Sequence, residues 1–419
     1  MRVVWLSHFI PYPPRGGSRQ RSYNLIRHLA AQHEVHVVML NMLGEGGEAL
    51  AGYKREFEKY CKGVEIWETP YRWRGARWWA QLAWSPLSYH HYAAQALWSP
   101  ELEAGWKIVL GPNRGAIVHF DSIDLVRYFA AAEGFRRALN HHNCESVMAA
   151  RRADNEPHPL KKAYLRNQAA KIARAEQEWC PKVDVNLAVS ELDAERLRAA
   201  CPGAHFHVVE NGTDTDYFVP SDVPPEPNTL IFAGGLSWYP NVSGIQYFVR
   251  EIWPQVKRRC PGVRLCVAGR SPCRAVAQLA ARDPDITLVA DPEDIRPWVW
   301  RAAVFVCPIL DGGGTRLKIL DALAMGKTVV TTSIGIEGLD LRPEEHVLIA
   351  DSPKDFADQT LRALADSNMR HRLGLSGSKH VKRLYSWEVI ADHLEAAYHC
   401  ALQSPGCVLE GAKRARVTT

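Results

Sequence analysis

The sequence predicts an α/β protein with two Rossmann-like, doubly wound parallel-sheet domains in tandem. Three observations lead to this fold class. The chain has 419 residues, and because a domain of about 150 residues is typical, two large domains are the simplest division. Hydrophobic residues make up 47% of the chain and charged residues 23%, as in globular proteins with substantial cores. Short apolar β-type runs alternate with helical patterns in both halves, which favours parallel sheets.

The first half opens with a β-type run at residues 2–7, followed by the turn-forming residues PYPPRGG and a helical pattern at Leu25, Ile26 and Leu29. A second buried strand is expected at 34–41, so the chain begins with a β-α-β unit and hence a parallel sheet. Further apolar strands of this half are expected at 116–120, 137–141 and 185–189.

Between residues 202 and 227 the composition changes to loop-forming residues rich in proline, which predicts a domain boundary. We therefore expect an N-terminal domain at 1–205, a second domain at 206–385, a helix at 386–402 that crosses back to the first domain, and a flexible tail at 403–419. The second half repeats the alternation, with expected strands at 229–233, 263–268, 286–289, 304–308 and 328–332 and expected helices at 245–260, 315–325 and 387–402.

Charge and targeting signals exclude several classes of protein. The chain carries 51 basic and 46 acidic residues, a net charge of +5, which is too small and too dispersed for a dedicated nucleic-acid binder. The N-terminal apolar run stops at Pro11 without the features of a signal peptide, and no stretch reaches the roughly 18 uninterrupted apolar residues of a membrane span. Ten dispersed cysteines are typical of reduced thiols. We expect a cytoplasmic protein.

The most informative motif is DGGGTRLKILDALAMG at 311–326, which directly follows an apolar run. Its three glycines let a ligand approach the backbone, Thr315 is placed to cap the following helix, and free N–H groups at a helix start favour a phosphate. The glycines are Gly312, Gly313 and Gly314. Arg316 and Lys318 add positive charge beside them. We therefore predict that a diphosphate binds here.

Later residues of the motif suit the rest of a nucleotide. Asp321 lies about one and a half turns into the expected helix, where its carboxylate reaches a ribose hydroxyl pair, and Gly326 is placed to end the helix. The alternative is a plain flexible turn with Asp321 as a solvated helix residue. The position between a buried strand and a helix favours phosphate binding, and the spacing differs from that of a Walker A loop.

The motif and the residues after it, DGGGTRLKILDALAMGKTVVTTSIGIEGL, closely resemble the donor-site segment of the retaining family-4 glycosyltransferases of GT-B fold, especially the branch of bacterial exopolysaccharide gene clusters. Five other segments match the family's motifs in the same order: PPRGGSRQRSYNLIRHLA, HHNCES, AVSELDAERL, VVENGTDTDYF and FAGGLSWYPNVSGIQYF. The resemblance covers about residues 1–400 and implies two Rossmann-like domains that face each other across a cleft.

Two positions depart from the family pattern. Where the family commonly has two glutamates eight positions apart, this chain has Gly313 and Asp321, so backbone N–H groups are expected to hold the donor sugar in place of the first carboxylate. Many members have an arginine after the first donor-domain glycine, but here Gly235 is followed by Leu236. Arg270, together with Arg316 and Lys318, is our candidate for neutralising the diphosphate.

The resemblance also implies roles in the first domain. Gly16 and Gly17 match the first glycine loop and contact donor phosphate or acceptor, unless they form a plain turn. His142 matches the family's cleft histidine and is our third catalytic candidate beside Arg316 and Lys318, with packing as the alternative; Asn143 and Glu145 follow it on the acceptor side. Glu337 contacts the nucleotide or caps a helix, and the Asn-Gly-x-Asp segment at 211–214 shapes the hinge.

Resemblance implies transfer of a sugar from a nucleoside-diphosphate sugar, UDP or GDP, to a hydroxyl acceptor with retention of configuration and without a further cofactor. No D-x-D motif stands in a metal-binding context, since the triplet from Asp214 to Asp216 lies in the expected interdomain turn, so we predict metal independence. Two other functions stay open. A GT-B-fold sugar-nucleotide epimerase shares the architecture, and a degenerate scaffold is suggested by Gly313 and Gly235.

A tryptophan-rich, basic segment at residues 68–92, ETPYRWRGARWWAQLAWSPLSYHHY, bears on partners. This composition suits contact with anionic lipid. The alternatives are internal packing and a platform for the acceptor sugar. Lipid contact would place the protein on the inner face of a membrane and would agree with a lipid-linked acceptor.

Overall fold

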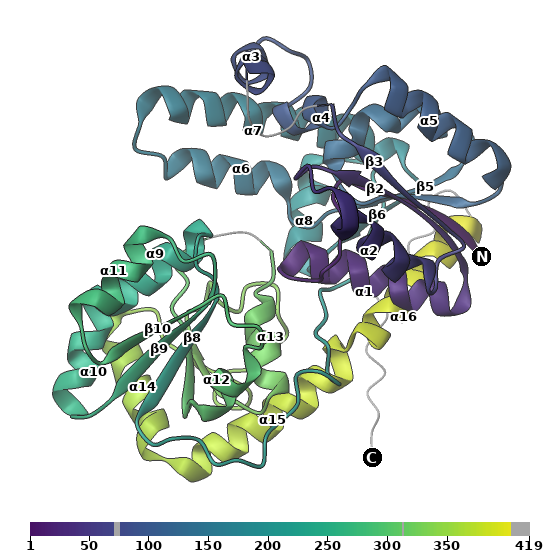
Figure 1. The fold of residues 1–419 in the computed structure, drawn as a ribbon. Helices are drawn as coiled ribbons and strands as arrows, with labels where there is room; N and C mark the ends of the chain where they lie inside the picture. The colour runs from purple at the N-terminus through teal and green to yellow at the C-terminus, as the bar shows by residue number, and fades with distance from the viewer. Residues whose placement is uncertain (71–75, 312–313, 404–419) are drawn as a thin grey trace. The chain divides into compact units, whose positions relative to one another are not determined.

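A computed structural model describes residues 1–70, 76–311 and 314–403 of the chain. It divides into two compact units (Figure 1). Unit 1 comprises Met1–Glu210 together with the chain from Ile390 onward, and unit 2 comprises Asn211–Val389. Each unit contains one parallel sheet with helices packed against it, so the expected fold class is confirmed.

Unit 1 is built on a seven-stranded sheet in the order β3-β2-β1-β4-β5-β6-β7, with every pair parallel. The strands are β1 (Arg2–Ser7), β2 (Glu34–Asn41), β3 (Gly63–Glu68), β4 (Ile117–Phe120), β5 (Arg136–Asn140), β6 (Val185–Ala188) and β7 (Phe206–Val208). Its helices are α1 (Gly17–Gln32), α2 (Gly47–Glu58), α3 (Ala76–Trp84), α4 (Tyr92–Ala96), α5 (Pro100–Leu110), α6 (Glu145–Asp154), α7 (Pro159–Trp179) and α8 (Glu191–Ala200).

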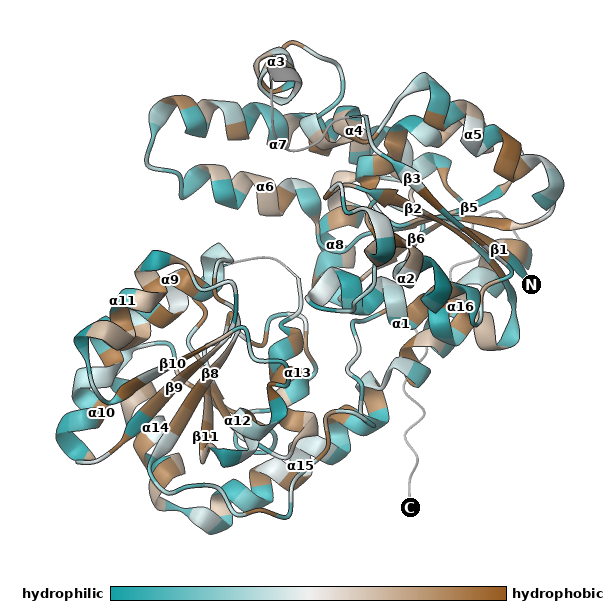
Figure 2. Cartoon of the chain, in the orientation of Figure 1, coloured by the Kyte–Doolittle hydropathy of each residue, from teal (hydrophilic) through white to brown (hydrophobic). Residues whose placement is uncertain are grey.

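The central strands of unit 1 are buried on both faces because helices cover the sheet, which is why they are continuous apolar runs in the sequence. Figure 2 shows these strands in brown. The core around them contains Trp106, Phe120 and Phe129, all fully buried. The expected strands at 2–7 and 34–41 are confirmed at their bounds, and those at 116–120, 137–141 and 185–189 lie within one residue at each end.

Unit 2 is built on a six-stranded sheet in the order β10-β9-β8-β11-β12-β13, again parallel throughout. The strands are β8 (Thr229–Gly235), β9 (Arg264–Arg270), β10 (Ile286–Ala290), β11 (Val304–Cys307), β12 (Thr328–Thr331) and β13 (Leu348–Ile349). Its helices are α9 (Tyr239–Tyr247), η5 (Phe248–Ile252), α10 (Trp253–Arg259), α11 (Arg274–Arg282), α12 (Arg296–Arg301), α13 (Leu317–Ala324), α14 (Pro353–Ala365) and α15 (Ser367–Tyr385).

Two expected helices of unit 2 differ from the structure. The helix expected at 245–260 begins earlier, at Tyr239, and contains a π-helical turn before Trp253. The helix expected at 315–325 begins two residues later, at Leu317, because Arg316 has a non-helical backbone with φ −93° and ψ 84°. Gly326 follows α13 with φ 70°, as predicted for a glycine that ends a helix.

The last helix, α16 (Trp387–Gln403), begins in unit 2 and runs into unit 1 from Ile390. Ile390, Leu394 and Tyr398 are fully buried, one turn apart, so this face of the helix is part of the core of unit 1. None of the described helices is both long and apolar enough to cross a bilayer.

Candidate functional site

In unit 2, the second-last residues of two adjacent strands are glycines that bring the two backbones unusually close. Gly234 at the end of β8 has φ 151°, and Gly269 at the end of β9 has φ 153°. A Cβ atom on Gly269 would lie 1.7 Å from the carbonyl oxygen of Gly234. The two strand ends therefore approach each other more closely than residues with a Cβ atom allow, at the edge of the sheet where ligands of open α/β folds bind.

Lys318 lies over the end of β8. Its ammonium group donates a hydrogen bond of 2.6 Å to Asn241 Oδ1, and the Asn241 amide donates one of 2.8 Å to the carbonyl of Gly235. A Cβ atom on Gly234 would lie 2.7 Å from Lys318 Nζ. The sequence placed Lys318 and Gly235 in one site, and the structure brings them together through Asn241, a residue that the motif analysis did not select.

Lys318 is largely buried, and no carboxylate of the described residues lies within salt-bridge distance of its ammonium group. Burial lowers its pKa to about 8, and Arg316 beside it lowers the pKa further while Asp321 acts in the opposite direction. A cation in this position favours an anionic ligand, because burying a charge without an opposite charge is costly.

Arg316 and Thr315 precede α13. Arg316 is 9% exposed, and its guanidinium donates to the carbonyl of Gly314. Thr315 does not cap the helix: its hydroxyl accepts a 2.7 Å hydrogen bond from the side chain of Asn211, and α13 has no side-chain cap. The expected capping role of Thr315 is therefore wrong, because the chain turns again at Arg316 before the helix starts. Gly312 and Gly313 lie outside the described residues.

Asp321 is held by the segment that leads into unit 2. Thr213 donates a 2.6 Å hydrogen bond to Asp321 Oδ1, and burial raises the pKa of Asp321 to about 7 although this hydrogen bond lowers it. Asn211 and Thr213 thus support both ends of the motif. Gly212 between them is required, since a Cβ there would lie 2.8 Å from the Trp387 ring.

Two further candidates lie on neighbouring loops of unit 2. Arg270 ends β9, and its carbonyl accepts a hydrogen bond from the backbone of Leu236. Glu337 is half-buried in the turn after β12, where its N–H donates to the carbonyl of Ile334. Arg270 is therefore joined to the loop that follows Gly235 through the backbone, and Glu337 lies in a separate turn of the same unit.

In unit 1 a buried carboxylate organises the strand ends. Asp121 follows β4 and is fully buried. Its Oδ2 accepts hydrogen bonds from the hydroxyls of Ser22 at 2.8 Å and Ser7 at 3.1 Å, and its Oδ1 accepts one from Asn140 Nδ2 at 3.2 Å. Burial alone would raise the pKa of Asp121, but neighbouring histidines hold it well below its usual range. Asp121 is therefore a carboxylate.

Three histidines surround Asp121. His142, which is 8% exposed, places Nε2 at 3.4 Å from Oδ1; His119 lies at 3.9 Å; and His8 Nδ1 lies at 3.8 Å from Oδ2. Burial lowers the pKa of both His8 and His119 to about 4, so both are neutral at pH 7. The rings of His8 and His142 are 5.5 Å apart. His142 thus belongs to a hydrogen-bonded cluster rather than to the apolar core.

Among the described residues, His8, Asp121 and His142 present ligand-type atoms within 4.8 Å of one another. Both oxygens of Asp121 already accept hydrogen bonds from hydroxyl and amide groups. These three hydrogen bonds use three of the roughly four lone-pair sites of the carboxylate, which leaves at most one, on Oδ1, for His142 or an ion.

The acceptor-side candidates of the sequence lie next to this cluster. Asn143 donates a 3.2 Å hydrogen bond to Glu145 Oε1. Burial, and then the charge of Asp124, raise the pKa of Glu145 to about 8. Glu145 is therefore largely protonated at pH 7 and able to donate a hydrogen bond.

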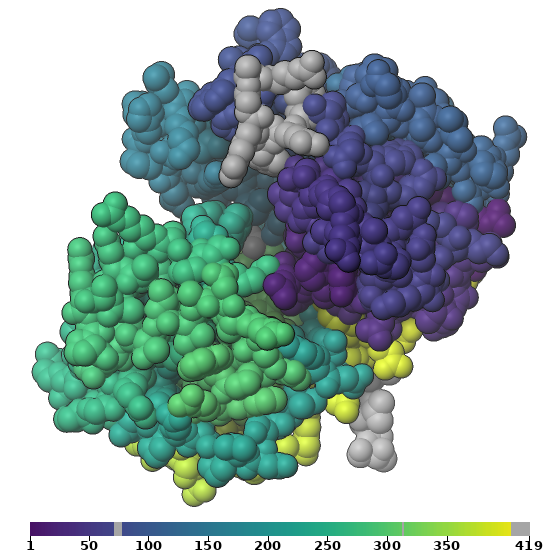
Figure 3. Space-filling model, viewed as in Figure 1, coloured from purple at the N-terminus to yellow at the C-terminus, as the bar shows by residue number. Residues whose placement is uncertain are grey.

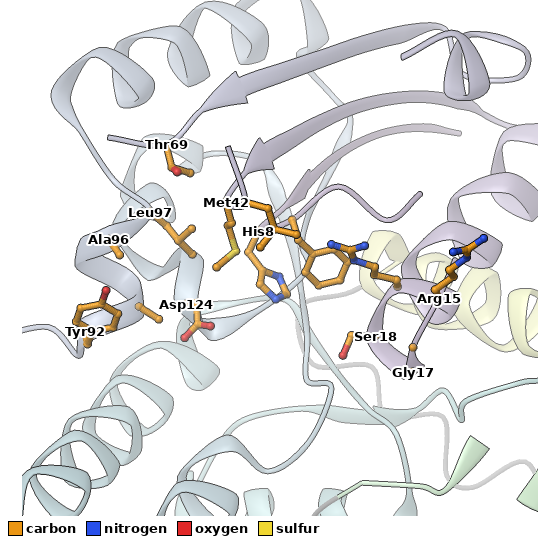
Figure 4. A pocket seen from close by; sticks show the side chains of 15 residues that line it. His8, Arg15, Gly17, Ser18, Met42, Thr69, Tyr92, Ala96, Leu97 and Asp124 are labelled. Carbon is orange, nitrogen blue, oxygen red and sulfur yellow. The ribbon is translucent and has the colours of Figure 1, made fainter. Parts of the chain in front are cut away.

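Gly16 and Gly17 line a cavity of about 500 Å³ in unit 1, where α1 begins (Figure 4). His8 and Asp124 line the same cavity. Figure 4 shows Arg15 and Gly17 at one end, Asp124 and Tyr92 at the other, and His8 between them. The structure thus brings the first glycine loop to the side of the histidine cluster.

His8, Asp121 and Asp124 were not predicted from the sequence as site residues. A signal for them existed: His8 directly follows the first strand and Asp121 directly follows the strand expected at 116–120. Carboxyl ends of parallel strands meet at one edge of a sheet, and β1 and β4 are neighbours. What was lacking was the order of the strands.

Known proteins match both parts of the chain. The family described as "Glycosyltransferase Family 4" matches residues 15–217, and "Glycosyl transferases group 1" matches residues 227–366. The chain belongs to glycosyltransferase family 4. The two matches lie in different halves of this family-4 protein, and between them they contain every site residue predicted from the sequence, whereas His8 precedes both.

Solved structures agree with the fold of this family-4 protein. Sucrose-phosphate synthase from Thermosynechococcus elongatus has a TM-score of 0.70 and 17% identity, over 95% of this chain and 98% of that one. Anabaena HepE in complex with UDP has a TM-score of 0.66 and 12% identity, over 95% and 100%. At these identities the likeness shows the fold, which is GT-B.

One curated relative is an uncharacterized 44.6 kDa protein in the cps region of Klebsiella pneumoniae, 30% identical over 135 residues. The aligned stretch covers 30% of this family-4 chain and 35% of the relative. The match therefore spans about a third of that protein's length.

Proposed function

We propose that this chain transfers a sugar from a nucleoside-diphosphate sugar to a hydroxyl acceptor. The observation that carries the proposal is Lys318, a largely buried cation without a carboxylate partner, held at the end of β8 by Asn241 and placed beside Arg316. A diphosphate at this position supplies the missing negative charge.

The chemistry follows from where charge develops. The bond between the anomeric carbon and the β-phosphate oxygen breaks, and the acceptor oxygen bonds to the anomeric carbon. The acceptor hydroxyl gives its proton to the departing phosphate oxygen, and the nucleoside diphosphate leaves. Negative charge accumulates on the departing phosphate, so Lys318 and Arg316 stabilise the transition state more than they stabilise the bound donor. Asp321, supported by Thr213, is proposed to hold the ribose hydroxyls.

Several finer features belong to the same proposal. Retention of anomeric configuration and metal independence are supported by the resemblance of the donor segment and by the two cations. UDP is the first donor nucleotide to examine, because a solved structure of similar fold, HepE, contains UDP. The relative from a cps region supports a role in polysaccharide assembly.

The deciding experiment is binding of UDP and GDP, and of their sugars, to wild type and to Lys318→Met, measured by thermal shift. A ligand at 100 times its dissociation constant adds about 2.7 kcal/mol to the free energy of unfolding. We expect one diphosphate to stabilise wild type and to lose affinity roughly tenfold or more in Lys318→Met, because a charge-assisted hydrogen bond contributes ~1.5–3 kcal/mol.

The control is Lys327→Met, which removes another buried lysine of unit 2 that donates to the carbonyls of Trp300 and Ala302. This variant should lose stability but not donor affinity. Equal loss of affinity in both variants, or no stabilisation by any diphosphate, would refute the donor site. Turnover of donor without an acceptor product would point to the epimerase.

We also propose that the segment from 76 to 92 contacts a membrane surface. Four large apolar side chains of this segment are exposed: Trp79 (63%), Trp84 (62%), Leu87 (77%) and Tyr89 (56%). The guanidinium of Arg174 lies 4.0 Å from the Tyr89 ring, which adds positive charge beside them. Figures 1 and 3 show α3 standing out from the rest of unit 1. Exposed indoles next to cations suit an anionic lipid surface.

Vesicle sedimentation checks this contact. We expect wild type to bind vesicles of phosphatidylcholine and phosphatidylglycerol more strongly than vesicles of phosphatidylcholine alone. The double variant Trp79→Ser, Trp84→Ser should bind at least about tenfold more weakly, since each buried indole contributes more than ~1 kcal/mol. Trp238→Ser removes a comparably exposed indole of unit 2, at 52%, and should bind like wild type. Equal binding of all three proteins would refute the contact.

A further inference from the structure

The cavity of unit 1 has the size and position of a ligand site. Its volume of about 500 Å³ lies within the range of roughly 300–1,000 Å³ that small-molecule sites occupy. It opens where β1 and β2 end and where α1 begins, so residues after two neighbouring parallel strands line it. This is the edge of the sheet at which ligands bind in such folds.

One part of the lining is apolar. Phe9, Met42, Ala96 and Leu97 contribute carbon and sulfur atoms to it, and Leu43, 61% exposed, continues this surface toward solvent. An apolar wall that extends into an exposed leucine suits a flexible hydrocarbon chain better than a free sugar, whose hydroxyls require partners.

The other end is cationic. Arg15 and Arg19 line the cavity, and neither guanidinium has a carboxylate within salt-bridge distance among the described residues. Between them lies the start of α1, which has no acidic residue in its first turn. Two arginines beside unbonded N–H groups favour a phosphate. The imidazole of His8 and the carboxylate of Asp124, which can both form hydrogen bonds, lie farther along the cavity.

The cavity is attached to the exposed tryptophan-rich segment. Thr69 and Tyr92, which line it, stand on either side of that segment in the sequence. The end of the segment is anchored: Lys171 of α7 donates hydrogen bonds to the carbonyls of Ser85 and Ser88, at 2.5 and 2.6 Å. Trp79 and Trp84 lie on α3, which contacts α4, and Tyr92 of α4 lines the cavity, so a membrane bound by these indoles is expected near the cavity.

From these observations we infer that the cavity of unit 1 binds the acceptor as a phosphorylated lipid, with the phosphate at Arg15 and Arg19, the hydrocarbon chain along Met42 and Leu43, and a hydroxyl of the head group toward His8. The role of this lipid as the acceptor rests on the proposed function, because only a transferase requires an acceptor. The binding itself is independent of the donor site.

The probe is farnesyl phosphate below its micelle concentration, titrated into the full-length protein by calorimetry and compared with farnesol and with glucose 1-phosphate. We expect farnesyl phosphate to bind at least about tenfold more tightly than either, because each of them lacks one of the two recognised parts. The variant Arg15→Ala, Arg19→Ala should lose about tenfold in affinity for farnesyl phosphate and keep its affinity for UDP. Arg27→Ala, which removes an exposed arginine of the same helix outside the cavity, should behave like wild type.

Three results would overturn the inference. Glucose 1-phosphate binding as tightly as farnesyl phosphate would show that the cavity takes a soluble acceptor. Loss of UDP rather than of farnesyl phosphate in the double variant would assign the arginines to the donor. If wild type binds UDP but not farnesyl phosphate, the lipid site is refuted and the donor site is not. If wild type binds farnesyl phosphate but not UDP, the donor site is refuted and the lipid site is not.

Discussion

At the scale of single residues, Lys318 determines how the proposed donor site responds to pH. Burial lowers its pKa to about 8, so in the free protein the ammonium group loses its proton as the pH rises through that value. An anionic donor favours the charged form and therefore raises this pKa on binding. Binding near pH 8 is thus coupled to proton uptake.

We accordingly expect the affinity for UDP to fall as the pH is raised from about 7 to about 9. Lys318→Arg keeps its charge over this range, so its affinity for UDP should change less with pH. Because UDP ionises in the same way in both experiments, this variant also serves as the control for the ionisation of UDP. Calorimetry in buffers of different ionisation enthalpy checks the proton uptake. Parallel pH profiles for wild type and Lys318→Arg would contradict the assignment.

A second residue-scale feature is the contact between Gly234 and Gly269, the second-last residues of β8 and β9. Gly269→Ala would bring a Cβ atom to 1.7 Å from the Gly234 carbonyl oxygen at a φ of 153°, so the strand ends must separate. We expect a loss of about 3 kcal/mol or more in the free energy of unfolding, measured by denaturant titration.

The matched control is Gly262→Ala, which has a positive φ of 81° but no atom within 4 Å of the added Cβ. It should cost only about 1 kcal/mol, the usual cost of backbone strain. If both variants lose the same stability, backbone strain and not the close approach explains Gly269.

At the scale of elements, α16 contributes a polar group to the histidine cluster. Tyr398 is fully buried, and its hydroxyl lies 2.6 Å from His119 Nδ1. The His119 ring stacks on Trp5 with 3.5 Å between ring centres, so it has little freedom to find another partner. The helix thereby helps to fix the orientation of a ring beside Asp121.

Tyr398→Phe should lower the free energy of unfolding by ~1–3 kcal/mol, because His119 Nδ1 loses its partner in a buried site. Thermal unfolding checks this. His399→Ala on the same helix removes an exposed side chain whose ion pair with Glu395 lies at the surface, and should change stability by less than about 0.5 kcal/mol. An unchanged melting temperature for Tyr398→Phe would show that the hydrogen bond contributes nothing.

Elements also differ in how well the sequence predicts them. The central strands β1, β2 and β11 are continuous apolar runs, so their type and bounds follow from composition. The edge strand β3, GVEIWE, is only partly buried and mixes charged with apolar residues, and it was not predicted. The start of α13 was misplaced because Thr315, a good capping residue, hydrogen-bonds to Asn211 from far along the chain.

At the scale of the whole molecule, the proposed reaction obtains its positive charge from side chains. Treatment with EDTA should therefore leave the transfer rate within about twofold of the untreated protein, measured as release of nucleoside diphosphate. A loss of rate that Mg²⁺ or Mn²⁺ restores would contradict metal independence. His8→Ala would then show whether the His8, Asp121 and His142 group holds the ion.

The fold class could be read from the residues alone, and the proposed phosphate-binding motif from Asp311 to Gly326 could be selected from them, because hydrophobic periodicity and a local motif are properties of contiguous sequence. The cluster of His8, Asp121 and His142 could not, since its members follow three different strands. Only the order β1-β4-β5 in the sheet places those strand ends together, and side chains that meet across a sheet leave no local pattern. The cavity of unit 1 was hidden for the same reason, because its walls come from segments that only tertiary packing joins.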